Sequence, residues 1–365
     1  MFVYNNASLV HWKKIMINDL YIEKYNNYLL NEEEIKNKKL IFQSGPVSLF
    51  FKVTDLCQLD CVFCNAKQYS NNKTLKFDII KNTIDTYGRK AINVEWIGGE
   101  PTLYPQFEKL IDYAEKYKLK QVIVTNGLSL KGIIAEKLIK YNADIIISID
   151  SSNKDLYNKI RKKSDFDVLM SNIEQLNSLR TKYNHSGHFG INFCVFKQNY
   201  QDIPNIIEFA KENNFKHINF IEATDIDKDL LLDDNNKKEI DDLFIIVKEK
   251  ADKYSIDFFN PFDDKNIEQK EDLGLYCYHP FSELGVNTEE EYGVCICRKL
   301  LLNNNSNDIW NCENIKQYRE KSYANIMCAD NCKTCALIDI RKNYHPQILQ
   351  TIMNIKNKLD KEGMN

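Results

Sequence analysis

The sequence predicts a partial, TIM-like (β/α)6 barrel followed by a smaller, cysteine-rich α+β domain. Between residues 47 and 221, short apolar runs alternate with longer amphipathic stretches, a pattern typical of right-handed parallel βαβ units. After residue 274 this repeat stops, and seven of the 11 cysteines fall between residues 277 and 335. The length of 365 residues also exceeds one typical hydrophobic core, which favours two units.

The barrel elements follow one another in strand–helix order. Expected strands cover residues 47–53, 93–97, 121–124, 144–149, 190–196 and 217–221, and expected helices lie near 77–88, 106–118, 130–141, 165–182 and 202–213. Six strands are too few to close an eight-stranded barrel, so we expect a curved, open one. A further helix is expected at 236–253. We expect the chain to divide into four parts: a helical lead-in over 1–45, the barrel over 46–265, the cysteine-rich domain over 266–340 and a C-terminal helix over 341–365.

The composition narrows the class of protein. The net charge is −3, with acidic and basic residues interleaved, which gives no general attraction to nucleic acid or to an anionic membrane. No apolar run reaches the roughly 18 residues that span a bilayer, and the first residues lack a secretory signal. We therefore expect a cytoplasmic protein with no membrane or nucleic-acid partner, in which clustered cysteines indicate metal binding rather than disulfides.

The first cysteine group has the spacing of an iron–sulfur loop. Cys57, Cys61 and Cys64 lie directly after the first expected strand. In a parallel barrel the active site is built from loops at the carboxyl ends of the strands. Three cysteines can hold three irons of a cubane cluster and leave the fourth iron open. The alternative is a zinc site or scattered thiols, but zinc needs four ligands and no fourth cysteine or histidine lies near.

This triplet, with Phe63 before its third cysteine, resembles the motif of radical S-adenosylmethionine (SAM) enzymes. Gly98, Gly99, Glu100 and Pro101, at the end of the second expected strand, resemble the GGEP motif of the same family. The resemblance implies that the open iron of a 4Fe–4S cluster binds S-adenosylmethionine. It also implies reductive cleavage to a 5′-deoxyadenosyl radical, which abstracts hydrogen from a substrate. The glycines allow close approach of backbone to a ligand. Glu100 either adds a charged acceptor or braces the loop.

Other barrel residues carry the resemblance less specifically. Ser148 and Asp150 end the fourth expected strand in a segment similar to the family's SLDG motif, with Ser151 in place of glycine. The resemblance implies that Ser148 and Asp150 face the ribose or carboxylate of the cofactor, and that Arg161 pairs with that carboxylate. A helix cap followed by a solvated arginine is the alternative. Cys194 is expected to be a small buried side chain.

The later cysteines resemble the SPASM or twitch domains of many radical SAM enzymes. The pattern is matched by Gly293, by the helix start at Ile309–Asn311 and by the final cysteine pair, Cys332 and Cys335. This resemblance implies at least one auxiliary 4Fe–4S cluster. The full SPASM spacings do not match, so the resemblance does not imply a second auxiliary cluster. The candidate ligands are Cys277, Cys295, Cys297, Cys328, Cys332 and Cys335. Cys295 and Cys297 share one strand face, so spacing does not choose between them, and Cys328 is either a ligand or a spare thiol. A structural zinc site with four cysteine ligands remains the alternative.

The resemblance favours a peptide-modifying enzyme. Dehydrogenation or epimerisation of a sugar- or aminoglycoside-type molecule is the second possibility, and a non-catalytic iron–sulfur carrier or sensor is the third. An electron donor such as flavodoxin or ferredoxin is expected as a partner. An electron carrier needs four protein ligands for each cluster, which argues against the third possibility.

Overall fold

The computed structural model describes residues 6–64, 72–224, 226–262, 277–295, 300–301, 308–328 and 346–361. Its strands are β1 (Ser48–Thr54), β2 (Asp60–Cys61), β3 (Asn93–Gly98), β4 (Lys120–Thr125), β5 (Asp144–Ser148), β6 (Arg161–Lys162), β7 (Phe189–Val195), β8 (His217–Glu222), β9 (Asp257–Phe259), β10 (Glu283–Val286), β11 (Tyr292–Cys295) and β12 (Leu300–Leu301). Its helices are α1 (Asn6–Lys36), α2 (Phe77–Tyr87), α3 (Phe107–Lys116), α4 (Gly132–Lys140), α5 (Lys154–Ile160), α6 (Phe166–Tyr183), α7 (Ile203–Glu212), α8 (Asp234–Tyr254), α9 (His279–Ser282), α10 (Glu313–Tyr323) and α11 (Pro346–Lys361).

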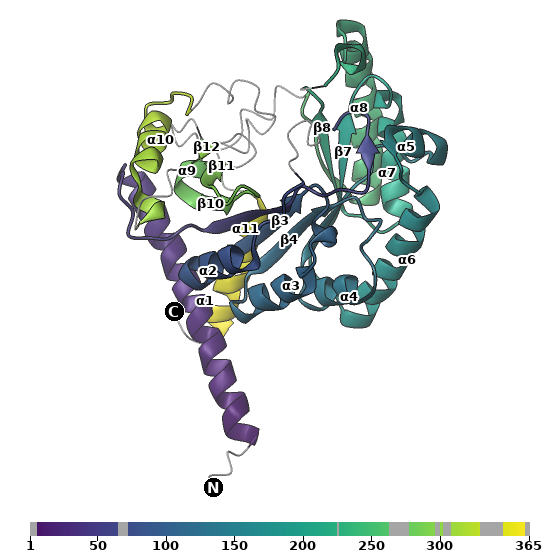
Figure 1. The fold of residues 1–365 in the computed structure, drawn as a ribbon. Helices are drawn as coiled ribbons and strands as arrows, with labels where there is room; N and C mark the ends of the chain where they lie inside the picture. The colour runs from purple at the N-terminus through teal and green to yellow at the C-terminus, as the bar shows by residue number, and fades with distance from the viewer. Residues whose placement is uncertain are drawn as a thin grey trace.

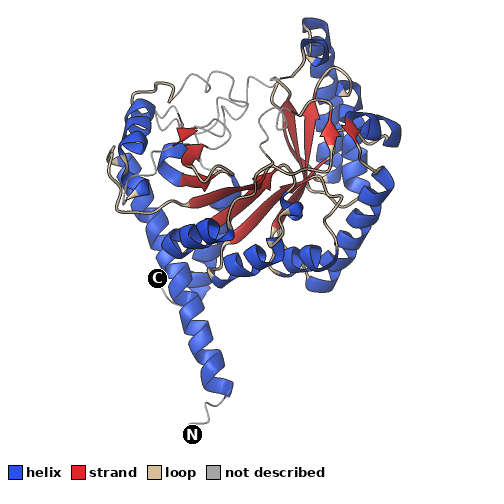
Figure 2. Cartoon of the chain, viewed as in Figure 1, coloured by secondary structure: helices blue, strands red, loops and turns tan. Residues whose placement is uncertain are grey.

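One curved sheet organises the chain. Its strand order is β12-β11-β10-β1-β3-β4-β5-β7-β8-β9, and every neighbouring pair from β10 to β9 is parallel. The helices that follow the strands cover the convex face (Figures 1 and 2). This is the predicted open α/β barrel. The six predicted strands are all present, each with ends within one residue of the prediction.

Successive side chains of each strand point alternately to the two faces of the sheet. Trp96 of β3 packs against Phe51 of β1 and against Phe107 of α3, so these side chains point outward to the helices. Glu95, one position earlier, therefore points to the concave face, because successive strand residues face opposite sides. On β7 the outward residues are fully buried and apolar, whereas Asn192 and Cys194 on the concave side are partly accessible. The concave face is thus the more polar one.

The C-terminal part extends the barrel sheet. β10 pairs in parallel with β1, with Ser48 opposite Glu283, and β11 and β12 continue antiparallel from it. The sequence analysis did not predict that this part of the chain would join the barrel sheet. The two terminal helices also meet, since α11 packs along α1 (Figure 1). No helix among the described residues has both the length and the apolar character to cross a membrane.

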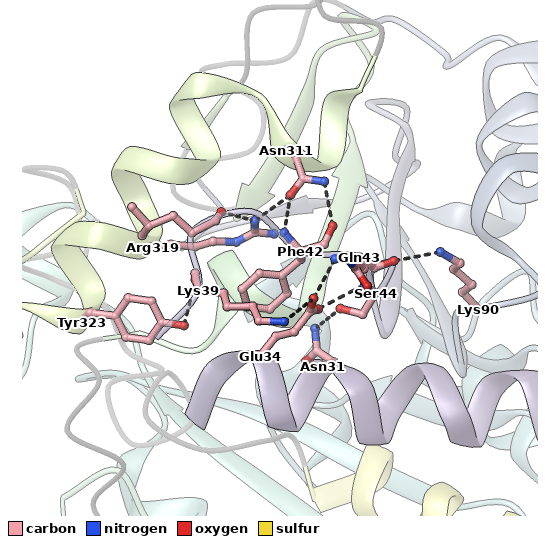
Figure 3. A network of polar contacts seen from close by, with 11 residues as sticks. Asn31, Glu34, Lys39, Phe42, Gln43, Ser44, Lys90, Asn311, Arg319 and Tyr323 are labelled. Atoms are coloured by element: carbon pink, nitrogen blue, oxygen red, sulfur yellow. Dashed lines mark hydrogen bonds and ion pairs between the residues drawn. The ribbon is translucent and has the colours of Figure 1, made fainter. Parts of the chain in front are cut away.

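A buried arginine of α10 binds the segment that connects α1 to β1 (Figure 3). Arg319 donates to the carbonyls of Pro280 and Leu40 at 3.0 and 2.8 Å, and its guanidinium lies 4.0 Å from the ring centroid of Phe42. Asn311 pairs with the Phe42 backbone in both directions, accepting from its N–H at 2.7 Å and donating to its carbonyl at 2.8 Å. Segments far apart in the sequence are thereby held together.

Candidate functional site

The cysteine loop leaves the carboxyl end of β1 and is hydrogen-bonded to the glycine loop after β3. The Gly99 N–H donates to the Thr54 carbonyl and the Glu100 N–H donates to the Leu56 carbonyl, both at 2.8 Å. Leu56 immediately precedes Cys57. The structure therefore brings the two motifs of the sequence together at one end of the sheet.

This contact requires glycine at both positions. At Gly98, where φ is +153°, an added Cβ would lie 2.2 Å from the Thr54 carbonyl oxygen. At Gly99 it would lie 2.4 Å from the Leu56 carbonyl oxygen. Any side chain would push the cysteine loop away from β3. Pro101, which is buried, begins the short helical turn that follows.

The Glu100 carboxylate braces the same end of the sheet, which is one of the two roles expected for it. It is fully buried and accepts from the backbone N–H and hydroxyl of Thr102, the hydroxyl of Thr125 and the backbone N–H of Asn126. Burial raises the pKa of Glu100, and these four donors act in the opposite direction. With both oxygens occupied, the side chain ties β3 to β4.

The three cysteines of the loop are free thiols. Burial raises the pKa of Cys57, and it raises the pKa of Cys61 to about 11, while the positive charge of Arg161 acts to lower both. Cys64 is exposed, and its charge also raises the pKa of each of the other two, so the three sulfurs share one electrostatic environment. Within the described ranges, no three His, Cys, Asp or Glu side chains are gathered as ligands of a single metal ion.

Phe63 anchors the loop to the barrel rather than projecting freely. Its ring lies 5.3 Å from that of Phe196, and it packs on a small apolar cluster that includes Ile160 and Ala223. Cys194, which is partly accessible on the concave face, packs against the same cluster.

The segment after β5 is held by a second set of contacts. Asp150 is fully buried; its Oδ2 lies 2.6 Å from Nε of Arg161, and its Oδ1 accepts the Cys194 N–H at 2.8 Å. Arg161 is itself buried, so the solvated arginine considered as an alternative is wrong. Ser151 donates its hydroxyl to Asp202 at 2.7 Å. Ser148, the last residue of β5, is half-buried on the concave face.

The concave face also holds polar residues that the sequence analysis did not single out. Asn219 of β8 donates to Asn192 of β7 at 3.0 Å. Glu95 of β3 faces the ion pair of His279 and Glu283, whose Nδ1 and Oε2 lie 3.0 Å apart, and burial raises the pKa of Glu95 to about 8. The sequence does contain a signal for Glu95 and Asn192. Each is a polar residue that interrupts an apolar strand, and successive strand residues face opposite sides of the sheet.

The auxiliary cysteines are only partly described. Cys277, Cys295 and Cys328 are buried. Ser322 of α10 holds the Cys277 backbone, accepting its N–H at 2.9 Å and donating to its carbonyl at 2.6 Å. Cys297, Cys332 and Cys335 lie outside the described residues. Cys312 is the N-cap residue of α10, but its side chain makes no capping hydrogen bond.

The comparisons with known proteins agree with this arrangement. Residues 51–210 match the model of the Radical SAM superfamily. This part of the chain is a radical SAM domain. The family's cofactors are a 4Fe–4S cluster and S-adenosylmethionine.

Two curated relatives are similar to nearly half of the chain. The chain is 27% identical over 172 residues to a probable GTP 3′,8-cyclase of Methanocaldococcus jannaschii, covering 45% of this chain and 55% of the relative. It is 29% identical over 189 residues to a cysteine-type anaerobic sulfatase-maturating enzyme of Clostridium novyi, covering 46% and 49%. The chain thus spans about half the length of these curated relatives.

A solved structure shares the fold over most of the chain. SuiB of Streptococcus suis, bound to the precursor peptide SuiA, superposes with a TM-score of 0.62 at 17% identity. The match covers 86% of this chain and 74% of SuiB.

Three features of the radical SAM domain fit the family's cofactors. The donor set is three free thiols on one loop, and thiolates are the usual ligands of iron–sulfur clusters. The loop is pinned at its base by the glycine contacts described above. A cationic guanidinium lies beside one of the sulfurs, where it favours the thiolate that a ligand must supply.

Proposed function

We propose that this chain is a radical SAM enzyme that modifies a ribosomally made peptide. The observation that carries the proposal is the hydrogen-bonded contact between the cysteine loop and the GGEP loop at the carboxyl ends of β1 and β3. When bound, the cluster and S-adenosylmethionine supply a 5′-deoxyadenosyl radical that abstracts hydrogen from the substrate. The protein supplies ligands, orientation and exclusion of water.

The proposed cluster ligands are Cys57, Cys61 and Cys64. Because the first two thiols have raised pKa values, they carry protons before the cluster binds and release them as it assembles. The backbone at Gly98 and Gly99, fixed by its contacts to the cysteine loop, is proposed to receive the methionine part of the nucleotide. Ser148 lies on the concave face where the remainder of the nucleotide would extend. Glu100 keeps this end of the sheet rigid.

A peptide substrate is supported by two of the similar proteins. The Clostridium novyi relative is named for the maturation of a sulfatase, and the SuiB structure contains a precursor peptide. The resemblance to the GTP cyclase favours a small molecule as the second candidate. Both substrates would enter the polar concave face, where Asn192, Asn219 and Glu95 offer hydrogen-bonding groups.

An auxiliary 4Fe–4S cluster is proposed in the C-terminal part, with Cys277 and Cys295 as ligands alongside cysteines beyond the described residues. Flavodoxin or ferredoxin is the proposed electron donor.

Iron and sulfide analysis of the reconstituted protein tests the cluster assignment. The Cys57/Cys61/Cys64→Ala triple variant is expected to lose one cube of iron and sulfide and to keep the remainder. The matched control is Cys312→Ala, which removes a buried thiol that is not a proposed ligand and should leave iron unchanged. Equal iron in wild type and triple variant would contradict the assignment.

The substrate class is tested by mass spectrometry after incubation with S-adenosylmethionine and a reductant. A short peptide encoded beside the gene is expected to change mass only when both are present. Turnover stimulated by nucleotides and not by the peptide would favour the small-molecule candidate.

A further inference from the structure

Cys61 and Arg161 are joined through the backbone although 100 residues separate them. β2 and β6 form a separate two-stranded antiparallel sheet in which Cys61 is opposite Arg161. Next to this pair, the Val62 N–H donates to the Ile160 carbonyl at 2.9 Å. The end of α5 is thus attached directly to the proposed cluster loop, so the position of Arg161 relative to that loop is fixed by the main chain.

The Arg161 side chain is fixed as well. Its Nε lies 2.6 Å from Asp150 Oδ2, and the exposed fractions of the two side chains are 8% and 1%. Asp150 is held in turn by the Cys194 N–H, and the guanidinium lies 5.7 Å from the ring centroid of Phe63. Burying an ion pair costs desolvation energy that apolar residues of similar size would not incur. A role besides stability would account for this pair.

The remaining end of the guanidinium faces the sulfur of Cys61. Nη1 of Arg161 lies 3.9 Å from Cys61 Sγ, within the longer range of hydrogen bonds to sulfur. We propose that Arg161, anchored by Asp150, is a positioning residue that donates to the Cys61 ligand and raises the reduction potential of the cluster. This inference rests on the proposed function, since it requires a cluster on Cys61.

The physical reason is electrostatic. The reduced cluster carries one more negative charge than the oxidised one. A nearby cation and an N–H group directed at a ligand sulfur therefore stabilise the reduced state more. Net charge, hydrogen bonds to sulfur and solvent exposure are the main determinants of iron–sulfur potentials. Arg161 supplies the first two of these, and its burial limits screening by water.

A redox titration followed by EPR, without S-adenosylmethionine, tests the proposal. The signal of this cluster is the one that disappears in the Cys57/Cys61/Cys64→Ala triple variant. Arg161→Gln is expected to shift its midpoint potential downward. The Arg161→Gln/Asp150→Asn double variant keeps the net charge of the pair and should show a smaller downward shift. The matched control is Lys162→Gln, which removes an exposed charge from the adjacent position and should leave the potential unchanged.

An unchanged potential in Arg161→Gln, with weaker S-adenosylmethionine binding alone, would overturn the proposal, because Arg161 would then serve only the nucleotide. If that variant does not retain iron, Arg161→Lys is measured instead. It keeps the charge but loses the planar fork, so its potential should lie below that of wild type. If neither variant holds iron, ENDOR on wild type labelled with ¹⁵N-arginine should show a coupling from this cluster, and its absence contradicts the proposal. A wild-type protein that assembles no cluster on Cys61 contradicts the proposed function instead.

Discussion

The Glu100 carboxylate accepts the backbone N–H of Asn126 at 2.7 Å, which fixes the end of β3 to the end of β4. The Asn126 side chain then turns toward the cysteine loop, with its Nδ2 3.9 Å from Cys57 Sγ and 3.3 Å from Gln58 Oε1. A continuous set of contacts therefore runs from the GGEP segment through β4 to the first proposed cluster ligand. The first of the following predictions tests the Glu100 contacts in this set.

Glu100→Gln should destabilise the protein. The amide places an N–H₂ group where a carboxylate oxygen now accepts from N–H and O–H donors, so at least one buried donor loses its partner. The expected loss is about 1.5–3 kcal/mol in the free energy of unfolding, measured by urea titration. Glu174→Gln, at an exposed position of α6, should change it by less than about 0.5 kcal/mol. Equal effects of the two substitutions would show that the buried contacts of Glu100 contribute nothing.

Gly99→Ala should displace the cysteine loop. The new methyl group would meet two backbone carbonyl oxygens, those of Leu56 and Asp55, at 2.4 and 2.5 Å, and neither can move without the loop. We expect a reduced iron content after reconstitution together with a lower unfolding midpoint. At Gly45 the nearest atoms belong to the flexible Lys90 side chain, so Gly45→Ala should retain wild-type iron. Full iron loading of the Gly99 variant would refute the steric argument.

Arg319→Lys should weaken the contacts between α10 and the segment that connects α1 to β1. Lysine cannot reproduce the planar fork that donates to four acceptors, nor its stacking on Phe42 and Trp310. We expect a loss of about 2–4 kcal/mol of unfolding free energy, since buried carbonyls are left without donors. Arg89→Lys, in an exposed pair with Glu23, should cost less than about 0.5 kcal/mol. A similar cost at both sites would contradict the role given to Arg319.

Glu95→Gln should change the pH dependence of stability. The folded-state pKa of Glu95 is about 8, raised by burial and by Glu283, and it lies above the value of 4.5 for an unperturbed glutamate. Between these values the unfolded chain releases a proton that the folded chain retains, so wild-type stability falls as pH rises. His279 has a raised pKa, mainly because of Glu283, and contributes in the same direction.

The variant should lose only the Glu95 part of this slope. Urea midpoints at pH 5, 6, 7 and 8 should show Glu95→Gln gaining on wild type by up to about 1 kcal/mol per pH unit. A constant difference between the two proteins across this range would show that Glu95 ionises normally in the folded state.

Local sequence patterns were sufficient to predict the barrel. Each predicted strand is a mostly apolar run between polar turns, and each strand buries its outward side chains under a helix, so local composition and tertiary structure agree. The cysteine and glycine motifs are also local, and parallel topology alone places both at the carboxyl ends of neighbouring strands.

Three features depended on contacts between distant residues. β2 and β6 are two residues long and have no periodicity, so the pairing of Cys61 with Arg161 was not predictable. The parallel pairing of β10 with β1 joins residues more than 200 positions apart. The burial of Arg161 results from its pairing with Asp150, which the sequence analysis had not expected.

The most direct test of the central claim is the formation of 5′-deoxyadenosine from S-adenosylmethionine by the iron-loaded protein under anaerobic reduction. We expect the wild-type protein to form it, and each of Cys57→Ala, Cys61→Ala and Cys64→Ala to form none. A fully loaded wild-type protein that leaves S-adenosylmethionine intact, or a Cys61→Ala variant that cleaves it at the wild-type rate, would contradict the account.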